Sequence, residues 1–201
     1  MKRFPKVVSL ILAALLILSL FTGCSSSTDS NTTDPGSDTT ETRDTLRVAF
    51  TSEPPSLSIY DHSSLISMLM NVQMYNGLMR INYETLEPEC DLAESYTVED
   101  DTVWTFKLHE GVMFHNGEEM TSADVVASLQ YAKSLPSATL YTVSMETIEA
   151  VGDYTVRITT TEPYAGLLYD LAYYYNFIVP KSLIHAGNDF NTNPVGTGPY
   201  K

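Results

Sequence analysis

Basic residues are scarce in this chain of 201 residues, which has 11 Lys and Arg against 25 Asp and Glu and a formal net charge of −14 at pH 7. Lys2, Arg3 and Lys6 stand at the N-terminus, and without them the balance is 8 against 25, or −17. No basic patch is left to neutralise phosphates, so the composition argues against nucleic acid as a partner.

Long apolar runs are also few, and the longest extends from Val7 to Phe21 behind the three basic residues. It is about 15 residues long, shorter than the ~20 that a permanent membrane-spanning helix needs. A basic segment followed by such a run is typical of an export signal that is removed. Cys24 follows Phe21-Thr22-Gly23, and this end resembles the lipobox of bacterial lipoproteins, although Phe21 stands where the box usually has Leu. We therefore predict a signal peptide over 1–23, lipidation of Cys24 and a lipid anchor on the extracytoplasmic face of the cell membrane; ordinary secretion with cleavage nearby is the alternative.

Cysteine is nearly absent, since Cys24 and Cys90 are the only two. With Cys24 acylated, Cys90 would have no partner, so no intramolecular disulfide is expected. Residues 25–44 contain no aliphatic or aromatic side chain. Such a segment cannot offset its chain entropy by burial, so 24–44 is predicted to be a disordered tether.

Apolar patterning begins after this tether. Leu46 to Phe50 alternates with period two, as in a half-buried strand, and the prolines of Thr51–Ser56 end it. From Leu65 to Met79 apolar residues cover most of a helical circumference, which predicts a buried helix.

The middle of the chain has the clearest local signals. Alternation over Trp104–Leu108 predicts a strand, and 112–114 is expected to form a second short strand before a turn at 115–117. Thr121 is expected to cap a helix with Asp124 three residues on, and Pro136 to mark its end.

Catalytic and metal motifs are missing from the sequence. It contains no Gly-x-Ser-x-Gly elbow, and 194–201 lacks the Gly-Lys-Thr ending of a P-loop. His109 and His115 are six residues apart across a glycine, and no His-x-x-x-His pair occurs, so no metal site is predicted. The glycines of 194–201 are expected to let this segment pass close to another stretch of backbone. A secreted hydrolase and a surface sensor remain alternatives.

Four separated motifs carry a resemblance to a known family. They are EPPSL at 53–57, MYNGL at 74–78, the stretch DLAESYTVEDDTVWTFKLHEGVMFHNGEEMTSADVVASL at 91–129, and PVGTGPYK at 194–201. In order and spacing they resemble the family 5 extracellular solute-binding proteins, the oligopeptide, dipeptide and nickel binders of ABC importers. Two departures are Ser58, in place of a common acidic residue, and two additional residues before the LAES segment.

The resemblance implies an α/β, periplasmic-binding-protein-like class II fold that is incomplete here, because family members are more than twice as long. On that mapping, 45–70 and 164–201 belong to a partial lobe I, and 71–163 form a small α/β domain. Tyr154–Thr160 would close the small domain, Pro163 would lie in the first turn of a helix, and 177–180 would re-enter lobe I as a strand.

The resemblance also implies capture without turnover, so no catalytic residue, enzyme activity or cofactor is expected. The solute would be a peptide, with nickel or another small solute as the alternative, and the partner would be an ABC permease. The backbone of Ser63, Ser64 and Leu65 is expected to pair with the ligand, and Tyr141 to cover it. A plain helix cap for the serines and a core or surface position for the tyrosine are the competing interpretations.

Overall fold

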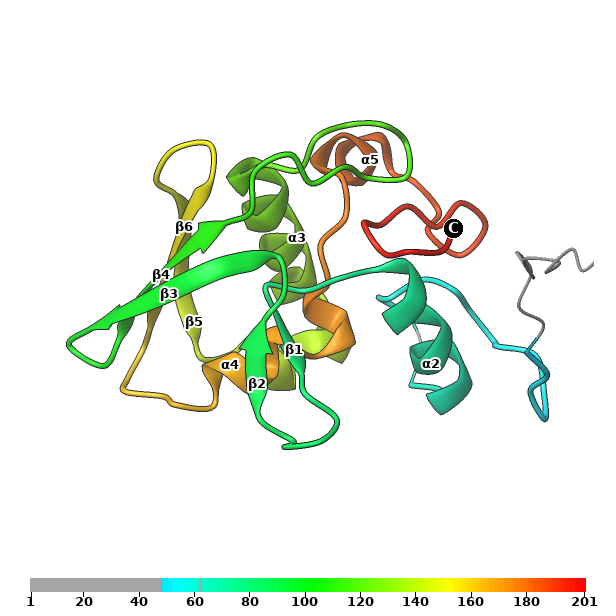
Figure 1. Cartoon of the computed structure of the whole chain (residues 1–201), viewed down its shortest axis with the longest axis horizontal. Coiled ribbons are helices and arrows are strands. Elements are labelled where there is room, and N and C mark those ends of the chain that lie inside the picture. The colour runs from blue at the N-terminus through cyan, green and yellow to red at the C-terminus, as the bar shows by residue number, and fades with distance from the viewer. Residues whose placement is uncertain (1–47, 62) are drawn as a thin grey trace, which may run out of the picture. The chain divides into compact units, whose positions relative to one another are not determined.

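A four-stranded antiparallel sheet is the largest element of the computed structural model, which describes residues 48–61 and 63–201 (Figure 1). Its strands lie in the order β3-β4-β6-β5, and their bounds are β3 (Ala93–Glu99), β4 (Val103–Leu108), β5 (Met145–Ala150) and β6 (Thr155–Thr160). The predicted signal peptide 1–23, Cys24 and the tether 24–44 lie outside the described residues. Residues from Val48 onward form one unit.

The sheet has one apolar and one polar face, because its side chains alternate. On β4, Trp104, Phe106 and Leu108 are buried, as the sequence predicted. Trp104 and Phe106 pair with Ile158 and Val156 of β6, so all five side chains share one face. The opposite face carries residues such as Lys107, which leaves it to solvent.

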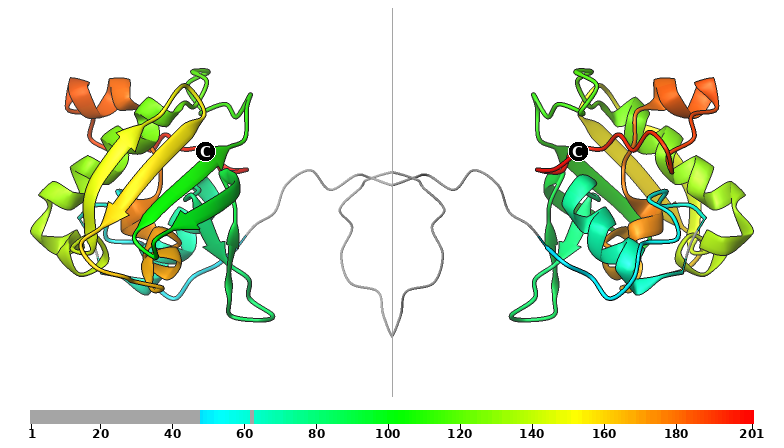
Figure 2. Two further views of the ribbon diagram at one scale, coloured as in Figure 1. Left: turned by 90° about the vertical axis from the view of Figure 1, so that its left-hand side faces the viewer. Right: turned by 90° about the vertical axis from the view of Figure 1, so that its right-hand side faces the viewer.

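Helix α3 (Ser122–Ser134) packs on the apolar face, and Val125 and Leu129 enter the same core (Figure 2). The predicted cap is confirmed: the carboxylate of Asp124 accepts from both the backbone N–H and the hydroxyl of Thr121, each at 2.9 Å. The helix ends before Pro136, as predicted. Asp124 also accepts from the backbone N–H of Lys181 at 2.9 Å. It thereby ties α3 to the start of α5 (Lys181–Ala186).

A short hairpin and helix α4 extend the same core. The hairpin pairs β1 (Met79–Ile81) with β2 (Pro88–Cys90) and projects away from the large sheet (Figures 1 and 2). Met79 of the hairpin is buried in one cluster with Leu167 and Leu171 of α4 (Leu167–Leu171). At the hairpin tip, Tyr83 is 81% exposed.

Helix α2 (Leu65–Met74) is shorter and less buried than predicted. It ends at Met74, and Tyr75 after it is extended. Two residues on, the backbone at Gly77 passes close to Leu171, where a Cβ would lie 2.7 Å from the carbonyl oxygen of Leu171. Leu65 is 64% exposed, whereas the buried positions include two polar residues. The prediction of a helix buried around most of its circumference was therefore wrong.

Four other predictions of local structure were wrong. Residues 48–50 form no strand, and the expected strand at 112–114 is reduced to one bridge between Met113 and Glu119. The segment 177–180 is extended but has no strand partner. α4 begins at Leu167, beyond Pro163. The predicted strand at 154–160 is confirmed as β6.

The division into a partial lobe I and a small domain stays a prediction. Within the described residues, no helix has the length and apolar character needed to cross a bilayer.

Candidate functional site

The start of α2 holds three of the four residues predicted to contact a ligand. Ser63 and Leu65 are exposed and Ser64 is half-buried. Ser64 occupies the cap position in an extended conformation, but its side chain makes no capping hydrogen bond. Its carbonyl oxygen accepts from the N–H of Met68 at 3.0 Å. The first-turn N–H groups of a helix have no partners within it, so this end presents backbone donors.

Tyr141, the fourth predicted residue, ends the short helix η2 (Pro136–Tyr141) and is half-buried. Its ring stacks on that of Tyr173, with centroids 3.8 Å apart and an angle of 17° between the planes. A hydrogen bond with the Tyr173 side chain, and then burial, raise the pKa of Tyr141 to about 12. The phenol is therefore neutral near pH 7, and it offers an apolar face with a polar edge.

The sequence contains a stronger aromatic signal than Tyr141 alone, namely three consecutive tyrosines at 173–175. They lie around the short helix η3 (Tyr174–Asn176), and we refer to Tyr141, Tyr173, Tyr174 and Tyr175 as the tyrosine cluster. Neighbouring rings in it have centroids 3.8 to 6.0 Å apart. Asn176 is fully buried and holds the cluster, because its amide donates to the carbonyl oxygens of Tyr141 at 3.0 Å and Asp170 at 2.8 Å.

The structure relates the two halves of the predicted site through this cluster. η3 contacts both α2 and η2, and Met74 of α2 is buried in the same core as Tyr174 and Tyr175. Between Ser63–Leu65 and Tyr141 the structure gives no hydrogen bond. α2, which begins at Leu65, and η2, which ends at Tyr141, therefore both contact η3.

The segment 194–200 runs against the end of α2. The N–H of Gly198 donates to the carbonyl oxygen of Met74 at 2.9 Å, and a Cβ at Gly196 would lie 2.2 Å from that same oxygen. The predicted close backbone passage is confirmed. His115 joins this contact: it accepts at Nδ1 from the N–H of Gly196 at 3.3 Å and, with its proton on Nε2, donates to the Gly198 oxygen at 2.8 Å.

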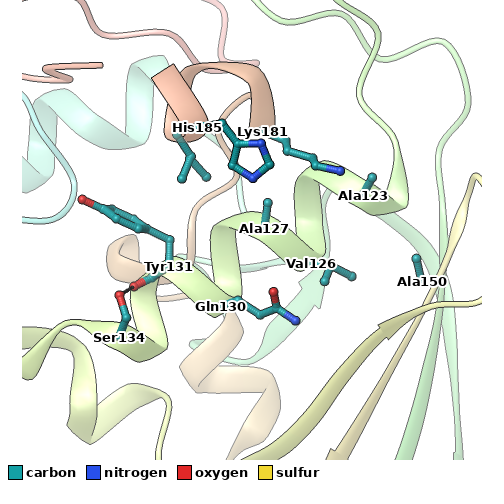
Figure 3. A pocket seen from close by; sticks show the side chains of 10 residues that line it. Ala123, Val126, Ala127, Gln130, Tyr131, Ser134, Ala150, Lys181 and His185 are labelled. Carbon is teal, nitrogen blue, oxygen red and sulfur yellow. Dashed lines mark hydrogen bonds between the residues drawn. The ribbon is translucent and has the colours of Figure 1, made fainter. Parts of the chain in front are cut away.

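A hollow of about 510 Å³ lies elsewhere, between α3 and α5 (Figure 3). Its α3 side includes small side chains such as Ala123 and Ala127 beside the larger Tyr131, and α5 contributes Lys181 and His185. None of the residues predicted to bind a ligand lines it.

No group of three or more His, Cys, Asp or Glu side chains able to hold a metal is found among residues 48–61 and 63–201. Cys90 is half-buried, and burial raises the pKa of its thiol, so its thiolate is disfavoured at neutral pH.

Comparison with known proteins gives the same family as the motifs. Residues 87–201 match the model of the bacterial extracellular solute-binding proteins, family 5 Middle. The glutathione-binding protein GsiB of Escherichia coli (strain K12) is 34% identical over 160 residues, which are 77% of this chain and 31% of GsiB. The HTH-type transcriptional regulator SgrR of Photorhabdus laumondii is 36% identical over 129 residues, which are 64% of this chain and 22% of SgrR.

Solved structures agree in fold. AgaA from A. tumefaciens R10, in complex with agropinic acid, matches 74% of this chain and 31% of its own with a TM-score of 0.67 and 30% identity. The periplasmic binding protein DppA from Helicobacter pylori, in complex with the peptide STSA, has a TM-score of 0.64 and 27% identity over 73% of this chain and 34% of DppA. NikZ from Campylobacter jejuni, in complex with Ni(L-His), has a TM-score of 0.63 and 28% identity over 75% of this chain and 31% of NikZ.

The predicted α/β fold of the periplasmic-binding-protein type is thereby confirmed, and this chain spans about a third of the length of GsiB and of these solved structures. The family match covers more than half of the 201 residues and includes the sheet, α3, η3 and α5. The chain therefore belongs to the family 5 bacterial extracellular solute-binding proteins.

Proposed function

We propose that this protein is the lipid-anchored solute-binding subunit of an ABC importer, which captures oligopeptides or dipeptides outside the cytoplasm and delivers them to a membrane permease. The observation that carries the proposal is the family match over residues 87–201. DppA, solved with the peptide STSA, supports a peptide as the solute. The complex of NikZ with Ni(L-His) keeps a metal chelate as the second candidate.

The exposed start of α2 suits an extended peptide. Main-chain pairing gives affinity without selecting particular side chains, because every peptide offers the same carbonyl oxygens. Ser63, Ser64 and Leu65 would supply the backbone groups, since the first turn of α2 has donors without partners in the helix. A bound peptide loses water at its polar groups, so each of them needs such a partner.

The tyrosine cluster suits the same ligand as a flat, uncharged surface. Tyr141 would cover the ligand, with Tyr173 stacked behind it at 3.8 Å to hold its ring in place. Aromatic contacts contribute about 0.5 to 1.5 kcal/mol beyond area burial. The match covers about a third of these relatives, and we place Ser63–Leu65 and Tyr141 on one wall of a cleft whose other wall belongs to the part of the relatives outside the match.

Calorimetry with named ligands tests the proposal. The peptide STSA, glutathione and Ni(L-His) are titrated into the protein purified from its producing bacterium and into the 201-residue chain. We expect STSA to bind the purified protein and to bind the 201-residue chain weakly. Binding of Ni(L-His) alone would favour the metal chelate, and tight stoichiometric binding of STSA to the 201-residue chain would contradict a two-walled cleft. Sustained cleavage of the peptide would indicate a hydrolase instead.

A pair of tyrosine variants locates the site. Tyr141→Ala removes the covering ring, whereas Tyr83→Ala removes a ring that is 81% exposed at the tip of the β1–β2 hairpin. We expect Tyr141→Ala to weaken STSA binding by about 2- to 13-fold and Tyr83→Ala to leave it unchanged. Equal losses in the two variants would contradict the assignment of Tyr141.

The two cysteines provide a matched test of the anchor. Cys24→Ser should abolish incorporation of a radiolabelled fatty acid and release the protein from the membrane fraction. Cys90→Ser should keep both the label and the membrane location. Labelling that persists in Cys24→Ser would contradict lipidation at this residue.

Co-purification with a membrane permease tests import against sensing. Recovery of the permease with the protein would favour import, and its consistent absence while ligand is still bound would favour a sensor.

A further inference from the structure

The hollow between α3 and α5 has walls that the fold holds in place. On α3, the buried carboxylate of Asp124 accepts from the backbone N–H of Lys181 at 2.9 Å. One turn further along the same helix, the buried hydroxyl of Ser128 bonds both backbone groups of Val179 at 3.0 Å. Two successive turns of α3 thus hold the chain that enters α5. The spacing of the two helices is therefore set by the protein itself.

Small or apolar side chains form the inner part of this hollow. Ala123 and Ala127 lie one turn apart on α3, and α5 contributes Ile184; all three are half-buried. Side chains as short as alanine let a ligand approach the helix closely. The volume of about 510 Å³ lies within the range of ~300 to 1,000 Å³ that is usual for small-molecule sites.

Two hydrogen-bond donors of α5 lie in the same space. Lys181 and His185 are four residues apart, so they share one face of the helix. Figure 3 shows both side chains between the two helices, over Ala123 and Ala127. A lysine ammonium group has three N–H donors and no acceptor, and an imidazole donates from the nitrogen that carries its proton. The two side chains can therefore donate to one anionic group.

The hollow lacks acidic side chains, although the chain as a whole is acidic. None of its lining residues is Asp or Glu, whereas the chain has 25 of these against 11 Lys and Arg. In the part of the chain that the structure describes, the ion pairs are those of Arg80 and Lys107, and Lys181 is in neither. Asp124, which holds the Lys181 backbone, does not line the hollow. A ligand with a carboxylate would supply the partner that Lys181 lacks.

We propose that the hollow between α3 and α5 binds a small organic carboxylate, whose apolar body lies on Ala123, Ala127 and Ile184 and whose carboxylate accepts from Lys181 and His185. None of the residues proposed to bind the peptide lines this hollow. The inference therefore stands or falls separately from the proposed transport function.

The probe is 4-phenylbutyrate, because it joins an apolar body to a carboxylate. Two analogues separate the contributions: 4-phenylbutanol has the same body without the charge, and acetate has the carboxylate without the body. Calorimetry on the purified protein should show saturable binding of 4-phenylbutyrate and weaker binding of both analogues. Prior saturation with the peptide STSA should leave this binding unchanged. Equal binding of the acid and the alcohol, or competition by STSA, would overturn the site.

Lys181→Met tests the charge, because methionine keeps an apolar stem and removes the ammonium group. We expect it to weaken 4-phenylbutyrate binding by about 1.5- to 5-fold, the range for an exposed ion pair, and to leave 4-phenylbutanol binding unchanged. Lys201→Met removes the same charge from an exposed residue that does not line the hollow, so it should have no effect. Equal losses in the two variants would show a general charge effect and contradict the proposal.

Filling the hollow tests its location. Ala127→Leu places a larger side chain on the α3 wall and should reduce binding of both phenyl ligands, whatever their charge. Ala186→Leu adds the same atoms to α5 outside the hollow and should leave both unchanged. Urea unfolding shows whether each variant is folded, and Ala123→Leu, one turn earlier, repeats the test if Ala127→Leu is not. Undiminished binding of 4-phenylbutyrate to a folded variant with a filled hollow would overturn the proposal.

Discussion

Removing the hydroxyl of Ser128 is expected to destabilise the protein far more than its size suggests. Ser128 lies on α3 with no exposed surface, and its Oγ donates to the carbonyl oxygen of Val179 and accepts from the N–H of Val179, both at 3.0 Å. Val179 lies in the extended segment that has no strand partner. One hydroxyl therefore satisfies both backbone groups of a buried residue.

The magnitude follows from those two groups. Ser128→Ala changes the volume little, so the cavity contribution is small, but it leaves a buried N–H and a buried C=O without partners. Each orphaned group costs about 1 to 3 kcal/mol, and the better helix propensity of Ala returns about 0.5 kcal/mol. We expect a net loss of about 1.5 to 5.5 kcal/mol in the free energy of unfolding, a large part of the ~5 to 15 kcal/mol of a typical domain.

Urea unfolding followed by the fluorescence of Trp104 measures this loss, because Trp104 is the only tryptophan and is buried. Ser134→Ala is the matched control on the same helix. Its hydroxyl is exposed and donates only to the carbonyl oxygen of Tyr131 at 2.6 Å, where water can replace it. We expect this control to change the free energy of unfolding by less than about 0.5 kcal/mol.

The reasoning would be refuted if Ser128→Ala and Ser134→Ala were equally stable at an unchanged dependence on urea. That result would mean that the groups of Val179 find other partners once the hydroxyl is gone. An altered urea dependence would instead indicate a change in the unfolded state or a loss of two-state behaviour.

Two further predictions concern packing and charge. Gly196→Ala should cost about 1 to 3 kcal/mol in urea unfolding, because its Cβ would lie 2.2 Å from the carbonyl oxygen of Met74; a change below about 0.5 kcal/mol would show that the two segments separate easily. Asp91→Asn should be at least as stable as the wild type at neutral pH. Burial raises the pKa of Asp91 above its ordinary value, and it outweighs the hydrogen bond from Asn76, which acts in the opposite direction. The folded state then holds the proton more tightly than the unfolded chain, so wild-type stability falls as pH rises from the ordinary aspartate range through the raised pKa, and the variant lacks that fall. Urea midpoints measured across that range check this, and a variant that loses stability only at neutral pH would contradict it.

Local signals were enough to predict the elements that depend on local contacts. The cap joins Thr121 and Asp124, three positions apart, and the alternation on β4 needs only the strand itself, so both were confirmed. The segment 48–50 has the same kind of alternation but forms no strand, because a strand also needs a neighbour to pair with. The 177–180 segment failed for the same reason.

The candidate site was harder to predict because its parts are distant in sequence. Tyr141 is a single aromatic in its stretch of sequence, whereas its stacking partner Tyr173 lies in a run of three tyrosines, which is the stronger signal. Nothing in the pattern of α2 indicated that polar residues would be buried while Leu65 faces outward, since that depends on which other segments pack against the helix. Long-range packing decided both outcomes.

The contact between the end of α2 and the segment 194–200 has a consequence for synthesis on the ribosome. Thr197 donates to the side chain of Asn76 at 2.9 Å across 121 residues of chain. At about 5 to 20 residues per second, roughly 6 to 24 seconds pass between the appearance of the two partners. During that interval the carbonyl oxygens at the end of α2 lack these partners, so a translocation or chaperone factor can bind this helix end before residues 194–200 are made.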